Sequence, residues 1–169
     1  MHSILGRLGV VVAVGLLALA TVGRADEEKV PLDKLPKAIV KAVKDRFPDA
    51  KMVSASTEKE DGKTVYEVAI TEKGKKIDVS LTPEGVITGF EKEIAFKDLP
   101  KAVAKALEGK YPKATYKIVE EVFKVKDKKE KLEYYEALLT VGKKTVEVEV
   151  SLEGKIIKET EKKAEDKDK

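Results

Sequence analysis

The sequence predicts an α+β fold of two tandem repeats, each with one helix packed on an antiparallel meander sheet of three to four strands. Three observations predict it: a segment repeated within the chain, a helical spacing of apolar residues in each copy, and a change to alternating apolar and polar residues after each helix. The chain has 169 residues, of which 38% are charged. This length suits two small units that share an interface.

The internal repeat begins with two nine-residue segments that match position by position. Residues 35–43 read LPKAIVKAV, and residues 99–107 read LPKAVAKAL. The correspondence returns further along, where Tyr66 and Glu67 align with Tyr135 and Glu136. We therefore expect a first repeat over residues 26–95 and a second over residues 96–160, the second with an insertion from Lys124 to Leu132.

Each copy opens with a segment in which apolar residues recur every three or four positions, as on one face of a helix: Leu32 and Leu35 through Phe47 in the first copy, and Phe96 and Leu99 through Tyr111 in the second. Pro36 and Pro100 are expected in the first helical turn, where the missing backbone donor costs nothing. Pro48 and Pro112 are expected to end the helices, because the residue before a proline disfavours helical geometry. Both helices therefore have predicted starts and stops.

After each helix the apolar residues alternate with polar ones. Tyr66, Val68 and Ile70 form one such series in the first copy, and residues 77, 79 and 81 form the next. The intervening segments EDGK, EKGK and TPEG are tight turns, too short to hold a crossover helix. The strands that they join must therefore be antiparallel.

The first 25 residues have the layout of a secretory signal peptide. The apolar run over residues 8–22 is about 15 residues long, shorter than the roughly 20 that a membrane-spanning helix needs. We expect cleavage after Ala25, with Ala20 as the alternative, and no stable membrane span afterwards; an uncleaved anchor is the other interpretation. The protein is then periplasmic or secreted. Residues 161–169 are almost wholly charged and are expected to form a disordered tail.

Composition excludes several classes of function. The chain has no cysteine, and its one histidine, His2, lies in the predicted signal peptide. The mature part therefore lacks a thiol nucleophile and the usual general base at neutral pH. Loss of Arg7 and Arg24 with the leader leaves 32 basic against 31 acidic residues, which gives no basic footprint for nucleic acid. We expect no enzyme, catalytic residue, cofactor or metal ligand.

The pattern of Leu-Pro-x-Ala-Ile/Val, an aromatic-Pro-x-Ala helix end and Tyr-Glu on a strand resembles the PepSY-like family, also described as similar to β-lactamase inhibitor proteins. The resemblance covers about Leu32 to Thr160 in two tandem copies. It implies an exported, non-catalytic module of the bacterial envelope that binds, inhibits or regulates a peptidase or another envelope protein. It brings no catalytic residues to carry over.

A partner would meet the polar face of the sheet or a strand edge. The candidate partner-binding surface consists of the repeated pairs Tyr66 with Glu67 and Tyr135 with Glu136, although tyrosines at such positions are commonly half-buried sheet residues. The basic segment from Lys124 to Lys131 is expected to be a solvated hairpin tip.

Two alternatives remain open. The first is an envelope sensor of a small ligand or a cation, using carboxylates such as Glu67, Asp78, Glu84 and their second-copy counterparts, because oxygen ligands suit hard cations. The second is an envelope hydrolase with a serine nucleophile, for which the chain holds no recognisable motif. Neighbouring carboxylates such as Glu120 and Glu121 are expected to be solvated surface charges.

Overall fold

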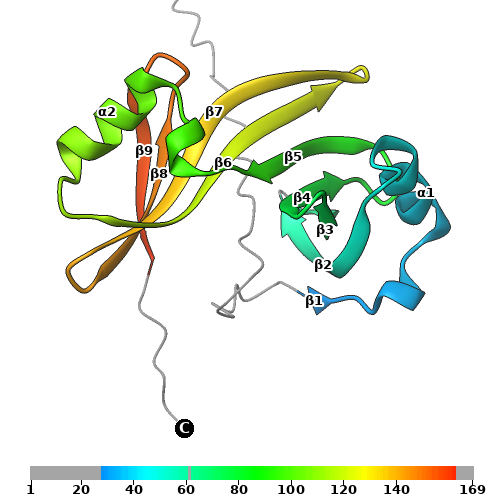
Figure 1. Ribbon diagram of the computed structural model, residues 1–169. Coiled ribbons are helices and arrows are strands. Elements are labelled where there is room, and N and C mark those ends of the chain that lie inside the picture. Colours follow the sequence, from blue (N-terminus) through cyan, green and yellow to red (C-terminus); the bar gives the residue numbers. More distant parts are fainter. Residues whose placement is uncertain (1–27, 61, 163–169) are drawn as a thin grey trace, which may run out of the picture.

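A single antiparallel sheet organises the whole described part of the chain. The computed structural model describes residues 28–60 and 62–162. Within them, nine strands follow one another in chain order across the sheet (Figure 1). Their bounds are β1 (Glu28–Lys29), β2 (Lys51–Glu60), β3 (Lys63–Glu72), β4 (Lys75–Leu81), β5 (Ile87–Glu93), β6 (Thr115–Lys126), β7 (Lys129–Val141), β8 (Lys144–Val150) and β9 (Ile156–Lys162).

The antiparallel meander is confirmed, but the sheet is larger than predicted, because β1–β5 of the first repeat and β6–β9 of the second join into one sheet. The last strand of the first repeat, β5, pairs with the first strand of the second, β6, and we call this junction the seam. At the seam the rings of Phe90 and Phe123 stack with centroids 4.6 Å apart. Strand β9 runs to Lys162, two residues beyond the predicted second repeat; the predicted signal peptide and residues 163–169 lie outside the described residues.

Each repeat carries one helix, α1 (Lys37–Arg46) and α2 (Lys101–Lys110). The predicted stops are in place: the N–H of Phe47, just before Pro48, donates to the carbonyl of Val43 at 2.8 Å. The predicted starts shift by one residue. Pro36 precedes α1 with ψ 140°, outside helical geometry, and Pro100 precedes α2 in the same way.

Short 3₁₀ helices come before the two prolines, η1 (Leu32–Lys34) and η2 (Phe96–Asp98). The residue in front of each proline, Leu35 or Leu99, has extended ψ. A residue before proline avoids the α conformation, so the expected continuous apolar stripe is divided into a 3₁₀ turn and an α-helix. Leu35 and Leu99 are nonetheless buried, because the turn still directs them to the sheet.

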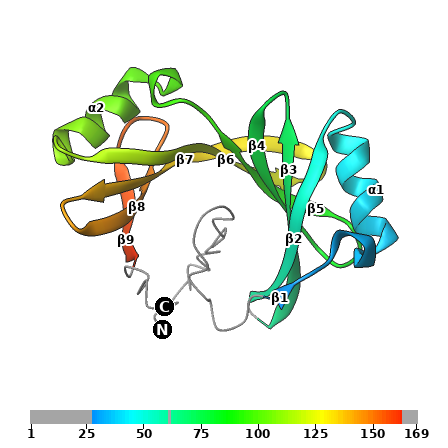
Figure 2. The ribbon, with the colours of Figure 1, turned by 60° about the horizontal axis from the view of Figure 1, so that its bottom comes forward.

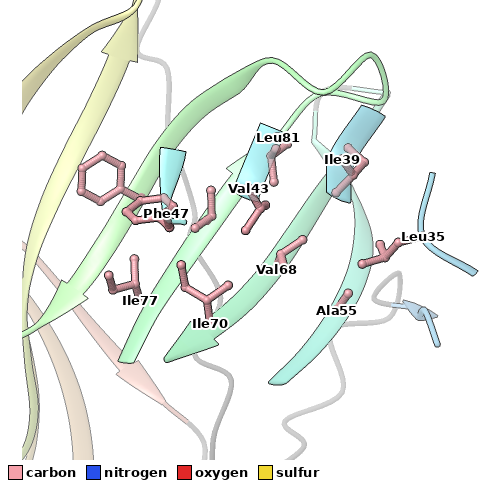
Figure 3. Close-up of a cluster of buried hydrophobic side chains, with 11 residues drawn as sticks. Leu35, Ile39, Val43, Phe47, Ala55, Val68, Ile70, Ile77 and Leu81 are labelled. Atoms are coloured by element: carbon pink, nitrogen blue, oxygen red, sulfur yellow. The ribbon is translucent and has the colours of Figure 1, made fainter. Parts of the chain in front are cut away.

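The sheet is curved, and both helices lie on its outer, convex side (Figure 2). Among the described residues, no helix lies over the inner, concave side. Under α1, the fully buried Ile39 and Val43 pack on aliphatic side chains of β3 and β4 (Figure 3). Under α2, Val103 and Leu107 occupy the same places on β7 and β8. Each repeat therefore has its own core on the convex side.

The insertion from Lys124 to Leu132 lengthens the β6–β7 hairpin and carries it toward the first repeat. The segment expected to be a solvated hairpin tip is mostly strand, with Asp127 and Lys128 alone between β6 and β7. Phe123 and Val125 pack against the core of that repeat. At the hairpin, the Glu130 carboxylate accepts hydrogen bonds from the Arg46 guanidinium at the end of α1, one of them 2.8 Å long from Nη2 to Oε2. The hairpin is thus a second link between the repeats.

Two hairpin glycines fix the distance between each helix and its sheet. Gly85 follows β4 with φ +82°, and Gly154 follows β8 with φ +83°. A Cβ atom on Gly85 would lie 2.7 Å from the carbonyl oxygen of Ala38, and one on Gly154 would meet the carbonyl of Ala102 in the same way. Only glycine therefore combines this backbone conformation with so close an approach to the helix.

Candidate functional site

Side chains of opposite character alternate along each strand and separate onto the two faces of the sheet. In β4, Ile77, Val79 and Leu81 face α1 and are buried in its core. Because successive side chains point to opposite faces, Asp78 and Ser80 lie on the concave face. The same alternation places a set of carboxylates there.

We call this set the concave carboxylates, and it crosses both repeats. Its members on the central strands are Glu67, Asp78, Glu91, Glu93, Glu120, Glu136, Glu147 and Glu149. Several are buried although no helix of residues 28–60 or 62–162 lies above them: Glu91 is 1% exposed, Glu136 5% and Glu120 6%. Buried carboxylates are rare unless they are paired, so this face requires an explanation other than surface solvation.

The strand register sets these carboxylates directly opposite one another. Asp78 faces Glu91 across β4 and β5. Glu120 faces Glu93 across the seam and Glu136 on its other side. Like charges in opposite positions destabilise a sheet, so the arrangement costs stability that the fold supplies elsewhere.

The innermost three carboxylates form a cluster, which we call the seam cluster. One carboxylate oxygen from each of Glu91, Glu120 and Glu136 lies within 4.8 Å of those of the other two. The three residues come from β5, β6 and β7, so the cluster exists only because the two repeats share one sheet.

Burial and mutual repulsion raise the pKa values of these groups. Burial, with the charges of Glu147 and Glu120, raises the pKa of Glu136 to about 9. Burial, with the charge of Asp78, raises the pKa of Glu120 to about 8. The pKa of Glu91 is also raised well above its ordinary value, and that of Asp78 rises to about 7, in both cases mainly through burial. The charges of Lys76 and Lys162 offset only part of this rise, so the face holds protons near neutral pH.

Basic residues lie near both sides of the concave face: on one side, the charge of Lys76 on β4 opposes the rise in the pKa values of Asp78 and Glu120. Lys162 and Lys158, both on the edge strand β9, pair with Glu147 at 2.6 Å and with Glu149 at 3.0 Å. The middle of the face differs, because within residues 28–60 and 62–162 no ion pair joins the seam cluster to a lysine or arginine.

The four residues of the predicted partner-binding surface separate between the two faces. Tyr66 packs against the core of the first repeat, and Tyr135 is buried in that of the second. Glu67 and Glu136 lie on the concave face. The two pairs therefore do not form one surface, and the two glutamates alone are placed with the other concave carboxylates.

Other expectations can be placed in the same way. Of the carboxylates named for a cation sensor, Glu67 and Asp78 lie on the concave face, whereas Glu84 is exposed in the β4–β5 hairpin. The expectation that Glu120 is a solvated surface charge is wrong: it is buried between Glu93 and Glu136, while Glu121 lies on the other face.

Glu91 and Tyr134 were missed by reasoning from the sequence. Tyr134 precedes the predicted Tyr135 by one residue and lies on the concave face, where burial and the surrounding glutamates raise its pKa. Alternation along β7 could have identified Tyr134 once Tyr135 was assigned to a core. Nothing comparable could have identified Glu91, because its neighbours come from strands across the seam.

The described part of the chain contains no helix long and apolar enough to cross a membrane. The concave face, with its carboxylates and one half-buried phenol, is suited to binding cationic groups, either basic side chains or metal ions.

Comparison with known proteins agrees with this architecture. A family model described as "Putative beta-lactamase-inhibitor-like, PepSY-like" matches the chain twice, over residues 24–89 and 86–158. No curated protein sequence matches the chain.

Solved structures from three Bacteroides species are similar in fold. A BLIP-like protein from Bacteroides fragilis has a TM-score of 0.59 and 19% identity, covering 83% of this chain and 93% of that one. A structure described as "putative periplasmic proteins" from Bacteroides eggerthii has a TM-score of 0.60 and 14% identity, with 75% and 88% covered. A DUF2874 family protein from Bacteroides ovatus has a TM-score of 0.57 and 16% identity, with 75% and 86% covered.

Proposed function

The chain belongs to the PepSY-like family of β-lactamase-inhibitor-like proteins, and we propose that it is an exported, non-catalytic binding module of the bacterial envelope that inhibits or regulates another protein. The family description and the periplasmic description of a similar structure support the compartment and the type of function. A peptidase of the envelope is the first class of partner to test.

The concave face of the sheet is the proposed binding surface, and the observation that carries this proposal is its row of carboxylates. In the part of the chain that the structure describes, the curved sheet has no helix on its inner side and offers a broad surface (Figure 2). Its centre is acidic, and the lysines of the edge strand β9 pair with Glu147 and Glu149, to one side of that centre. We therefore expect a partner that presents a convex surface with lysine or arginine side chains.

The non-catalytic part of the proposal rests on the side chains available. The concave face offers carboxylates and the hydroxyl groups of Ser80 and Tyr134, while cysteine is missing from the whole chain and the one histidine, His2, is outside the described residues. Without a thiol or an imidazole, the face lacks a thiol nucleophile and the usual general base at neutral pH. Binding is the function that such a surface serves best.

A capture experiment tests the proposal. The tagged full chain, exported by a bacterial host, is crosslinked in envelope extract, and the captured proteins are identified by mass spectrometry. The variant Glu93→Lys reverses one charge on the concave face and places an ammonium group opposite Glu120, so the fold should persist. The matched control Glu108→Lys makes the same change on the exposed side of α2.

We expect the wild type and Glu108→Lys to capture the same basic partner, and Glu93→Lys to lose it. Equal capture by all three proteins would show that the partner does not bind the concave face. Failure of the wild type to enrich any protein over an unrelated bait would overturn the proposed protein-binding function.

A further inference from the structure

The seam cluster has features that a protein-binding surface does not require. Its three side chains are at least 94% buried, with exposed fractions of 1% for Glu91, 6% for Glu120 and 5% for Glu136. A partner protein laid on the face would contact the rim carboxylates first. Groups this deep are suited to a ligand of atomic size.

Hydrogen bonding within the described chain leaves this cluster incomplete. The Oε1 atoms of Glu91 and Glu136 are buried and have no hydrogen-bond partner. A buried carboxylate oxygen without a partner costs free energy, and structures that keep one commonly use it for a ligand or an ion. Here two such atoms belong to side chains that converge on one point.

The charges around the cluster are a second, independent indication that it binds a ligand of positive charge. Glu120 has a carboxylate opposite it on both neighbouring strands, Glu93 and Glu136. On the convex face of the same seam, the register instead sets Lys92 opposite Glu121. At the seam, the convex face therefore sets opposite charges across from each other, whereas the concave face sets like charges across from each other.

The donor set selects the chemistry of the ligand. All three groups offer carboxylate oxygens, and the cluster contains no nitrogen or sulfur donor. Hard cations such as calcium and magnesium prefer oxygen, whereas zinc and copper favour imidazole or thiolate. Oxygens within 4.8 Å of one another fit around one ion, because calcium takes its oxygens at about 2.3–2.6 Å.

We propose that Glu91, Glu120 and Glu136 together bind one hard divalent cation, with calcium the first to test. The ion bridges β5 of the first repeat to β6 and β7 of the second. It supplies the positive charge that the centre of the concave face lacks, and it holds the two repeats together at the seam. The inference does not depend on a protein partner.

Calorimetry and thermal melting of the purified full chain test this site. The protein is stripped with EDTA, dialysed and titrated separately with calcium, magnesium and manganese chlorides. We expect one ion per chain and a dissociation constant of roughly 10⁻⁴–10⁻³ M, the range of extracellular calcium modules. At ten times that concentration the melting temperature should rise by about 4 °C.

Matched variants locate the ion. Glu91→Gln keeps the shape of the side chain and removes one ligand charge, so affinity should fall at least 10-fold while the protein stays folded. Glu120→Gln should lower the affinity in the same way. With two variants, the site can still be tested if one of them does not fold. Glu108→Gln, exposed on α2, should bind as the wild type does.

Each possible result either supports the cation site or overturns it. Saturable binding of any of the three ions that both seam variants weaken supports the site, and the tightest binder identifies the cation. The proposal is overturned if a folded wild-type protein binds none of them, or if Glu91→Gln and Glu120→Gln bind as tightly as Glu108→Gln. Since no extract is used, this result is independent of whether a protein partner is captured.

Discussion

On the convex face, β4 contributes three aliphatic side chains to a core beneath α1, whereas on the concave face the same strand contributes Asp78 and Ser80. The convex face buries apolar surface and supplies the stability of the fold. The concave face places carboxylates opposite one another, and their repulsion lowers the stability of the fold. A feature retained against stability is commonly functional, so the difference directs attention to the concave face.

Two adjacent leucines on β7 test most strongly whether the convex and concave faces differ in their contribution to stability. Leu139 is fully buried in the core under α2, while Leu138 is half-buried on the concave face. We expect Leu139→Ala to lower the free energy of unfolding by about 3 kcal/mol. Leu138→Ala should cost less than half as much, and urea denaturation measures both. Equal losses would mean that the concave face also forms a core.

The hairpin glycines extend the comparison to the contact between helix and sheet. Gly85→Ala would force a Cβ into the Ala38 carbonyl and should destabilise the protein by about 2–3 kcal/mol. Gly74→Ala is the control, because Gly74 also has a positive φ but open space around it, and it should cost about 1 kcal/mol. Thermal melts of both variants compare the two costs; a Gly74→Ala loss as large as that of Gly85→Ala would contradict the steric explanation.

Two neighbouring glutamates at the seam test whether a carboxylate destabilises the concave face but not the convex face. Glu120 faces Glu136 on the concave side, and Glu121 shares the other face with Lys92. In EDTA, Glu120→Gln should raise the free energy of unfolding by about 1 kcal/mol, because it relieves repulsion. Glu121→Gln should change it little or lower it slightly. A destabilising Glu120→Gln in urea denaturation would show that the concave carboxylates do not repel one another.

The smallest expected effect is at the link between α1 and the long hairpin. A double-mutant cycle with Arg46→Ala and Glu130→Gln should give a coupling of about 0.5 kcal/mol, because both side chains are partly exposed.

The same coupling should depend on pH. Hydrogen bonds from Arg46 hold the pKa of Glu130 below its ordinary value. The contribution to stability is therefore complete above the ordinary glutamate pKa and is lost as the pH falls through the lowered one. Repeating the cycle at neutral and at acidic pH measures this change, and a coupling that grows in acid would contradict it.

The sequence predicts the convex face far better than the concave face. The helix stripes ending at Phe47 and Tyr111 and the alternating residues of β4 are local patterns, so each repeat could be predicted from its own residues. The apolar stripe alone does not place Leu35 and Leu99 outside the helices, because it is the proline after each leucine that keeps that leucine out of the α conformation.

The seam cluster could not be predicted, because Glu91 and Glu120 are separated in the chain by all of α2. Their proximity depends on the pairing of β5 with β6, for which no turn residues provide a signal. The expectation that Glu120 is solvated failed for the same reason. A site formed between two repeats is visible only when the register across their junction is known.

Six of the eight strand pairs in the described chain are hairpins between consecutive strands, whereas β5 meets β6 only after the chain has passed through α2. Local pairings close short loops and form early, and pairings across longer loops pay more chain entropy before they gain contacts. The order of assembly should therefore be the two repeats first and their junction last. A cation bound at that junction would join after the rate-limiting step of folding, so calcium should slow unfolding in stopped-flow experiments and leave the folding rate nearly unchanged.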